Sequence, residues 1–201
     1  MKLCGCSNTT AESKIPPFNP TKPQSTSGSH VLQKQGAGMR ELRRKEKAIT
    51  DRNEMLGILE HTQYVTLAMC ADNEPYLVTV THGYNRERNC IYFHCATEGK
   101  KIDVLSVNNV VWGQALIDNG YVQGACDHLY ATVHFRGRVT FVEDIAEKEH
   151  ALRIMIHALD DDPSTVIKKQ LTPKSVARVN IGRIDIDYMT GKKAEKVVIS
   201  L

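Results

Sequence analysis

Two adjacent lysines, Lys100 and Lys101, follow a polar turn at the start of a predicted helix, a placement that suits phosphate binding. The segment Ile91–Leu105 (IYFHCATEGKKIDVL) reads as an apolar strand, a polar turn and a helix. A helix start offers free backbone N–H groups and the positive end of the helix dipole. Lysines added there make an anion cradle. The alternative is a solvated lysine pair on an exposed first turn.

Four further side chains near this segment could take part in chemistry. His94 could donate a hydrogen bond to a cofactor oxygen or cap the turn. Cys95 could be a nucleophile, but neighbours on an extended segment point to opposite sides, so His94 is poorly placed to activate it. We therefore expect a half-buried, unreactive Cys95. Trp112 and Gln114 lie two apart and could flank a cofactor or substrate, although such a tryptophan more often belongs to the core.

Several classes of protein are disfavoured by what the sequence lacks. The histidines match no zinc pattern, and neither GxGxxG nor GxxxxGK[ST] occurs, so we expect no metal site, dinucleotide fold or P-loop. The sequence contains no run of about 18 apolar residues, so we expect no membrane-spanning helix. The first residues do not resemble a secretory signal. The six cysteines contain no CxxC pair, which favours reduced thiols in the cytoplasm.

The chain divides into a predicted flexible tail at 1–38 and a folded domain at 39–201. The tail is rich in Ser, Thr, Pro and Gly and has no apolar periodicity. The first 50 residues hold nine Lys or Arg against three Asp or Glu. This basic excess lacks interleaved aromatic residues, so we interpret it as a solvated lead-in rather than a nucleic-acid-binding surface.

The domain itself is predicted to be mainly β. A helix capped by Asp51 precedes strands at 65–70, 76–84, 90–94, 110–118, 128–144 and 176–192, with helices at 99–107 and 147–159 and a short one after Pro163. Gly137 interrupts the longest strand and suggests a bulge. Hairpin-linked strands with inserted helices favour an antiparallel β-barrel with peripheral helices.

Three segments carry a family resemblance: EPYLVTVTHGY, YFHCATEGKK and DYMTGK. They resemble the pyridoxamine 5′-phosphate oxidase-related flavoproteins, most of all their nitroimidazole-reductase-like branch, over about residues 40–195. The resemblance implies an antiparallel Greek-key split barrel that binds FMN at a homodimer interface and acts on a small organic substrate. It assigns FMN contacts to Val78, Thr79, Val80, Thr81, His94, Cys95, Ala96, Lys100, Lys101 and Gln114.

The resemblance also indicates where this chain differs. Cys95 stands where that branch usually has serine, and the stretch DHLYAT (127–132) lacks the usual Trp and Arg, so we expect a changed substrate pocket. His128 and Tyr130 are candidate substrate contacts. The expected activity is an FMN-dependent oxidation or reduction, nitroreductase-like or related to pyridoxamine phosphate oxidation, with no catalytic residue named. The alternatives are a haem-binding or sensing protein without turnover and a module that has lost its cofactor.

Overall fold

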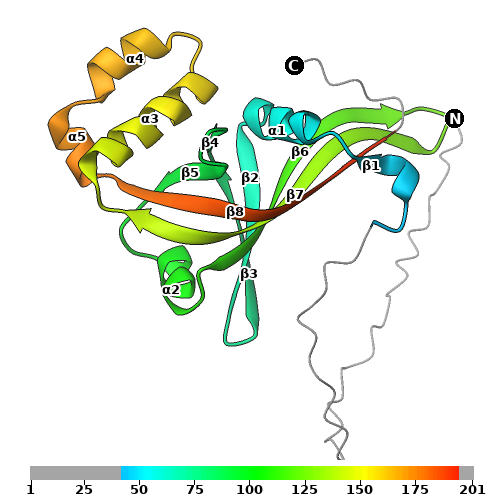
Figure 1. Ribbon diagram of the computed structural model, residues 1–201, viewed down its shortest axis with the longest axis horizontal. Coiled ribbons are helices and arrows are strands. Elements are labelled where there is room, and N and C mark those ends of the chain that lie inside the picture. Colours follow the sequence, from blue (N-terminus) through cyan, green and yellow to red (C-terminus); the bar gives the residue numbers. More distant parts are fainter. Residues whose placement is uncertain (1–41, 195–201) are drawn as a thin grey trace, which may run out of the picture. The chain divides into compact units, whose positions relative to one another are not determined.

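The computed structural model describes residues 42–194, so the predicted tail at 1–38 lies outside the described residues. Eight strands of the described chain form one antiparallel sheet in the order β3-β2-β6-β7-β8-β5-β4, with β1 paired to β8 (Figure 1). The strands are β1 Ala48–Ile49, β2 Tyr64–Ala71, β3 Glu74–Thr81, β4 Gly83–Asn85, β5 Cys90–Cys95, β6 Val110–Val122, β7 Asp127–Val142 and β8 Asn180–Lys193.

Helices stand between the strands and outside the sheet, as predicted. The 3₁₀ turn η1 and helix α1 precede β2, α2 follows β5, and three helices separate β7 from β8. Asp51 caps α1 as expected, since its side chain accepts from the backbone N–H of Asn53 at 2.8 Å. The helical bounds are η1 Lys45–Lys47, α1 Arg52–His61, α2 Lys100–Val107, α3 Ile145–Leu159, α4 Pro163–Gln170 and α5 Pro173–Arg178.

Two predicted strands differ from the structure for local reasons. The strand expected at 76–84 is divided at His82, whose buried ring bonds through Nε2 to the Leu59 carbonyl at 2.9 Å. The first part of the strand expected at 176–192 is instead the end of α5. Thr172 and Ser175 form a capping box there, and Pro173 suits a first helical turn.

The bulge predicted at Gly137 is present where β7 meets β8. The pairing shifts between Arg136 and Gly137, so that Asp187 of β8 is the extra residue. A Cβ on Gly137 would lie 2.6 Å from the Asp185 carbonyl oxygen, which only glycine avoids. The bend lets the sheet curl, so that β3 at one end of the sheet comes close to β5 near the other end. The predicted mainly β, antiparallel architecture is therefore correct.

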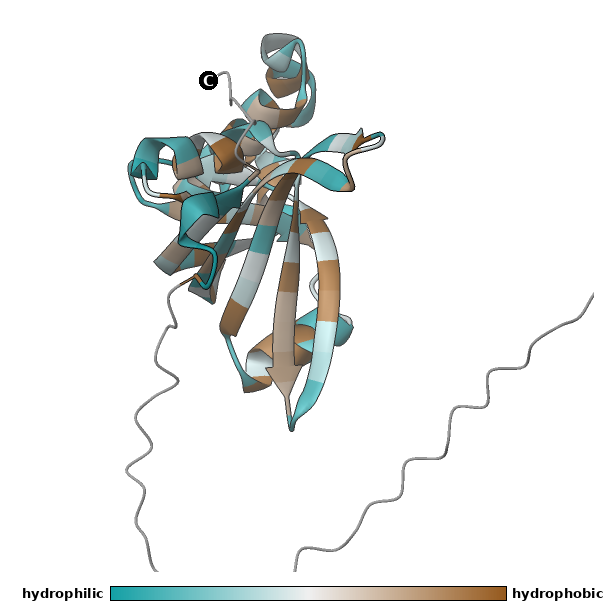
Figure 2. Cartoon of the chain, turned by 90° about the vertical axis from the view of Figure 1, so that its right-hand side faces the viewer, coloured by the Kyte–Doolittle hydropathy of each residue, from teal (hydrophilic) through white to brown (hydrophobic). Residues whose placement is uncertain are grey.

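The inner face of the curled sheet holds the main core. Apolar residues alternate with polar ones along the long strands, as the hydropathy colours show (Figure 2). Helix α1 closes one side of this core with Leu56, Ile58 and Leu59. The inward residues of the strands include Val65, Leu67, Ile91, Phe93, Val111, Val133, Phe135 and Ile184.

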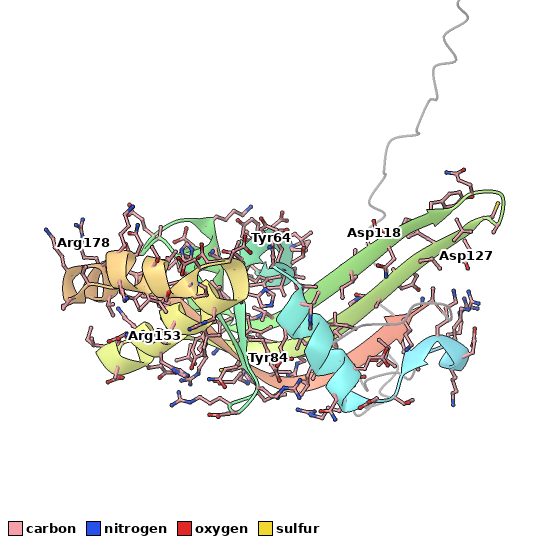
Figure 3. The ribbon with its side chains drawn as sticks, turned by 90° about the horizontal axis from the view of Figure 1, so that it is seen from above. Tyr64, Tyr84, Asp118, Asp127, Arg153 and Arg178 are labelled. Atoms are coloured by element: carbon pink, nitrogen blue, oxygen red, sulfur yellow. The ribbon has the colours of Figure 1, made fainter. Side chains whose placement is uncertain are left out.

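The outer face of the same sheet keeps large apolar side chains exposed. Trp112 is 42% exposed, so the expectation of a core tryptophan is wrong, and Leu77 is 65% exposed. Trp112 packs edge-on against Tyr188 at 5.9 Å between ring centroids. The ends of β6 and β7 extend beyond the rest of the sheet as a two-stranded arm that carries Asp118 and Asp127 (Figure 3).

Helix α3 is tied to the sheet through one carboxylate. Glu147 Oε1 accepts from Arg88 Nη1 at 2.9 Å, Tyr92 OH at 2.9 Å and Arg183 Nη1 at 2.8 Å. Burial raises the pKa of Glu147, but the hydrogen bonds from Arg183 and Tyr92 outweigh it and hold the pKa below its usual value. Within residues 42–194, no helix is long and apolar enough to cross a membrane.

Candidate functional site

The start of α2 has open backbone donors. Its N-cap, Gly99, has φ +118° and ψ 167°, a conformation almost restricted to glycine, and provides no side-chain cap. The Gly99 carbonyl accepts from Ile102 and Asp103, but the N–H groups of Lys100 and Lys101 donate to no acceptor in the described chain. Apart from its chain neighbours and the helix backbone, no described atom lies within 4 Å of a Cβ built on Gly99, so the space beside this residue is open.

Aromatic rings hold both lysine side chains near this helix start. Lys100 Nζ lies 5.0 Å from the centroid of Tyr76 on β3, and Lys101 Nζ lies 5.2 Å from the centroid of Phe93 on β5. The Phe93 ring packs against Gly182 of β8, where a Cβ would come within 2.2 Å of it. Two positive charges thus stand beside free N–H groups where β3 and β5 meet, which is an arrangement suited to a phosphate.

Cys95 ends β5 beside the lysines and is half-buried, as expected. Burial raises the pKa of its thiol, which the charge of Lys101 and a hydrogen bond from Asn180 lower by less. Asn180 Nδ2 lies 3.6 Å from Cys95 Sγ and donates to the Ala96 carbonyl at 3.2 Å. Asn180 therefore fixes the turn before α2, and the raised pKa favours the thiol form of Cys95 over an activated thiolate.

Strand β3 presents its predicted alternation at the edge of the sheet. Val80 is buried and Val78 packs against the core, whereas Thr79 faces outward and Thr81 is half-buried. Thr79 Oγ1 is 3.1 Å from Thr66 Oγ1. Because β3 pairs only with β2 among the described strands, its outer edge leaves backbone N–H and C=O groups available to a planar ligand.

Gln114 lies on the outer face, in line with Thr79. The strand register places five polar residues side by side across this face: Thr79, Thr66, Gln114, His134 and Thr190. Gln114 Nε2 donates to Thr132 Oγ1 at 3.3 Å. Burial and the nearby Lys192 lower the pKa of His134, which favours its neutral form. Gln114 and Thr79 thus share a surface that is distinct from the inward side where Tyr76 and Val80 lie.

The other predicted site residues lie elsewhere. The side chain of His94 lines a pocket beneath α3, α4 and α5, on the opposite side of β5 from Cys95. His128 and Tyr130 belong to the β6–β7 arm: His128 Nε2 is 2.7 Å from Asp118 Oδ1, and Lys192 Nζ lies 5.6 Å from the Tyr130 centroid. In a single chain, neither side chain on the arm contacts the lysines of α2.

Three residues that shape the site were not expected from the sequence: Tyr76, Phe93 and Asn180. Tyr76 alternates with Val78 and Val80, so its inward position was readable from the strand period. The part played by Asn180 depends on the pairing of β5 with β8, which places it opposite Cys95 and which no local pattern reveals. Within residues 42–194, no three His, Cys, Asp or Glu side chains gather as metal ligands.

An antiparallel barrel that is split along one edge, with helices outside it and two lysines beside the edge strand, defines the split β-barrel class. The family model for pyridoxamine 5′-phosphate oxidase matches residues 51–193. The chain therefore belongs to the pyridoxamine 5′-phosphate oxidase family, which confirms the resemblance of its motifs. No curated protein matches the chain.

Several solved structures share this fold. A Bacteroides thetaiotaomicron protein assigned to 5-nitroimidazole antibiotic resistance is 27% identical, with a TM-score of 0.62, over 73% of this chain and 86% of its own. The flavocytochrome Anf3 from Azotobacter vinelandii is 17% identical, with a TM-score of 0.65, over 79% and 74%. A FAD- and haem-binding protein from Mycobacterium smegmatis is 15% identical, with a TM-score of 0.61, over 77% of each chain.

Proposed function

We propose that this protein binds FMN and catalyses an oxidation or reduction of a small organic molecule. The observation that carries the proposal is the start of α2. The helix has no side-chain cap there, Gly99 has a backbone conformation almost restricted to glycine, and two lysines lie nearby, which together offer a place for one phosphate. Family membership and the flavin-binding relatives support a flavin as the bearer of that phosphate.

The remaining contacts follow from the position of β3 and β5. The edge of a flavin ring would meet the backbone of Val78–Thr81, while Cys95 and Ala96 would line the cofactor beside the lysines. His94 would contribute its backbone, since its side chain points away. A bound flavin supplies the electron or hydride transfer, and the protein supplies binding, orientation and electrostatics. Val78 and Val80 would keep water from the inward side of the ring.

The test compares FMN with riboflavin, which lacks the phosphate. The variant carries Lys100→Ala and Lys101→Ala together. Its matched control carries Lys168→Ala and Lys169→Ala, a lysine pair at the exposed end of α4. A charged hydrogen bond contributes about 1.5–3 kcal/mol, and exposure reduces that value. We therefore expect the variant to lose about 10- to 100-fold in FMN affinity and little in riboflavin affinity, with the control unchanged.

Three outcomes would contradict the proposal or part of it. Equal FMN binding by wild type and the Lys100 and Lys101 variant would remove the phosphate assignment. A haem Soret band in place of the flavin bands in the purified protein would favour the haem-binding alternative. A colourless protein that takes up no added FMN would indicate a module without a cofactor.

We further propose a homodimer whose two copies meet through the outer face of the sheet. Exposed apolar side chains there include Leu77 and Leu116, at 65% and 50% exposure, around Trp112. Such a patch is characteristic of an interaction surface. Thr79 and Gln114 lie on the same face, so a second copy would complete the surroundings of a cofactor bound along β3. The four cysteines within 42–194 are free thiols, which fits the proposal of a cytoplasmic protein.

A further inference from the structure

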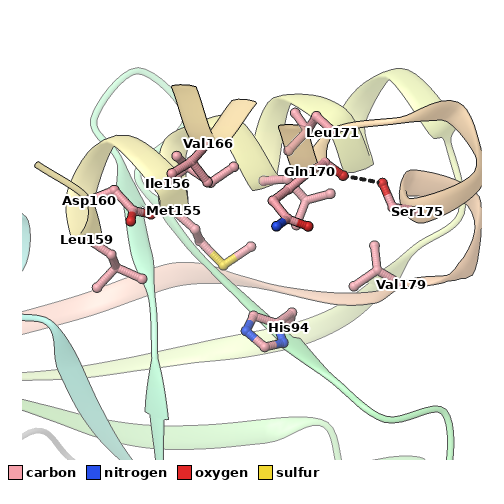
Figure 4. Close-up of a pocket in the computed structure, with 11 residues that line it drawn as sticks. His94, Met155, Ile156, Leu159, Asp160, Val166, Gln170, Leu171, Ser175 and Val179 are labelled. Carbon is pink, nitrogen blue, oxygen red and sulfur yellow. Dashed lines mark hydrogen bonds between the residues drawn. The ribbon is translucent and has the colours of Figure 1, made fainter. Parts of the chain in front are cut away.

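The pocket lined by His94 lies on the side of β5 opposite the lysines. This open pocket of about 390 Å³ lies between β5 and helices α3, α4 and α5, with the exposed His94 ring at its floor (Figure 4). Its walls are largely aliphatic and come mainly from α3, with Val166 of α4 and the residues that follow α4 and α5: Leu152, Met155, Ile156, Leu159, Val166, Leu171 and Val179. A concave apolar space of this size, with few polar groups, is typical of a small-molecule site.

The helices that form the roof do not fill this space themselves. Helix α4 has no buried residue, and α5 has only Val176. Both helices pack mainly against α3. Helix α3 in turn packs in a small second core that includes Tyr92, Ala151 and Met155. Val166 of α4 lines the pocket without being buried, so a ligand there would remove its side chain from water.

The polar groups of the pocket restrict what it could hold. The His94 ring forms no hydrogen bond in the described chain, and Figure 4 shows the Gln170 side-chain amide directed toward it. The Ser175 hydroxyl is already bonded to the Gln170 carbonyl at 2.5 Å. Of residues 42–194, no lysine or arginine lines the pocket, and Asp160 is among the lining residues. A negatively charged ligand would meet a like charge without a compensating cation.

We propose that this pocket binds a neutral, mostly apolar molecule of one or two rings whose single polar substituent bonds to His94. The site is separate from the proposed flavin site, because successive residues of β5 point to opposite sides: Cys95 faces the lysines and His94 faces the helices. The Gln170 amide is positioned to supply the second hydrogen bond.

Binding can be measured with 1-naphthol and its anionic analogue 1-naphthoate, by calorimetry and ligand-observed NMR on the full chain with and without saturating FMN. We expect one 1-naphthol per chain, weaker binding of 1-naphthoate, and no competition with FMN. His94→Phe keeps an aromatic side chain but removes the ring nitrogens, and it should weaken 1-naphthol binding about three- to tenfold. Val166→Phe fills the space and should weaken it more than about tenfold.

The control is His157→Phe. His157 lies on α3 and is exposed, as His94 on β5 is, but it lines a different cavity, with Tyr84 and His150. It should bind 1-naphthol like wild type. The proposal would be overturned if 1-naphthol did not bind saturably, if FMN displaced it, or if 1-naphthoate bound more tightly. It would also be overturned if His94→Phe and Val166→Phe each bound 1-naphthol as tightly as wild type does. Because α4 has no buried residue, Val166→Phe is expected to fold, which circular dichroism can check.

Discussion

Replacing Gly99 with alanine tests whether the backbone at the start of α2 is built for a ligand. The φ of +118° and ψ of 167° at Gly99 lie in a region that costs another residue about 1–3 kcal/mol. No atom lies within 4 Å of the added Cβ, so the penalty is backbone strain and not a steric clash. We expect Gly99→Ala to lower the free energy of unfolding of the cofactor-free protein by about 2 kcal/mol.

The size of the effect can be read from urea unfolding. With a slope of about 2 kcal/mol per molar urea for a domain of this size, the unfolding midpoint should fall by about 1 M. If the turn relaxes to relieve the strain, the N–H groups of Lys100 and Lys101 no longer point at the position proposed for the phosphate. The affinity for FMN should then fall about tenfold or more, in proportion to the charged hydrogen bonds lost.

The matched control is Gly124→Ala, at the tip of the β6–β7 arm. Gly124 has φ +77° and equally open surroundings, so alanine there should cost about 1–2 kcal/mol without changing FMN affinity. If Gly99→Ala left both the midpoint and the FMN affinity at their wild-type values, the conformational argument would be refuted. A loss of stability with full FMN affinity would show that the turn does not hold the phosphate.

Three other predictions concern the fold and its assembly. Tyr92→Phe should lower the free energy of unfolding by about 1–2 kcal/mol in urea titrations, because Glu147 loses one of three donors while both arginines remain. Burial holds the pKa of His82 below its ordinary 6.5, so the unfolded state takes up the proton first as the pH falls. Stability should decline from pH 6.5 down to that lowered pKa, and urea midpoints in His82→Gln should depend less on pH over this range. Trp112→Glu should convert the proposed dimer to a monomer in sedimentation velocity, whereas a variant that stays dimeric would place the interface elsewhere.

Much of the fold could be predicted because the sheet has a clear period. Apolar, strand-forming runs between turns identified β2, β5 and β7, alternation identified most of β8, and the glycine in the longest run marked the bulge at Gly137. The prediction failed where one residue outweighed the local pattern. His82 fits a β-strand by position but is drawn inward by the Leu59 carbonyl. Thr172 caps a helix whose last residues, Val176–Arg178, were predicted as the start of a strand.

The site was predictable only as far as its residues are neighbours in sequence. The lysine pair and the opposed directions of His94 and Cys95 follow from helix-start and strand geometry. That Tyr76 would lie under Lys100 depends on how far the sheet curls, which the sequence does not encode in any single motif. The pocket beneath α3, α4 and α5 could not be predicted either, since its walls come from separate segments, one of which was predicted as part of a strand.

The pairing of β8 has a consequence for how the domain assembles. This last strand lies between β7 and β5 and also pairs with β1: Cys95 stands opposite Asn180 and Ile49 opposite Gly191. Contacts so distant in sequence carry a large loop-closure cost and slow folding to the range of milliseconds to seconds. Until β8 docks, β5 and β7 keep open edges of the kind that pair with other chains. Aggregation during synthesis should therefore depend on how quickly this one strand finds its place.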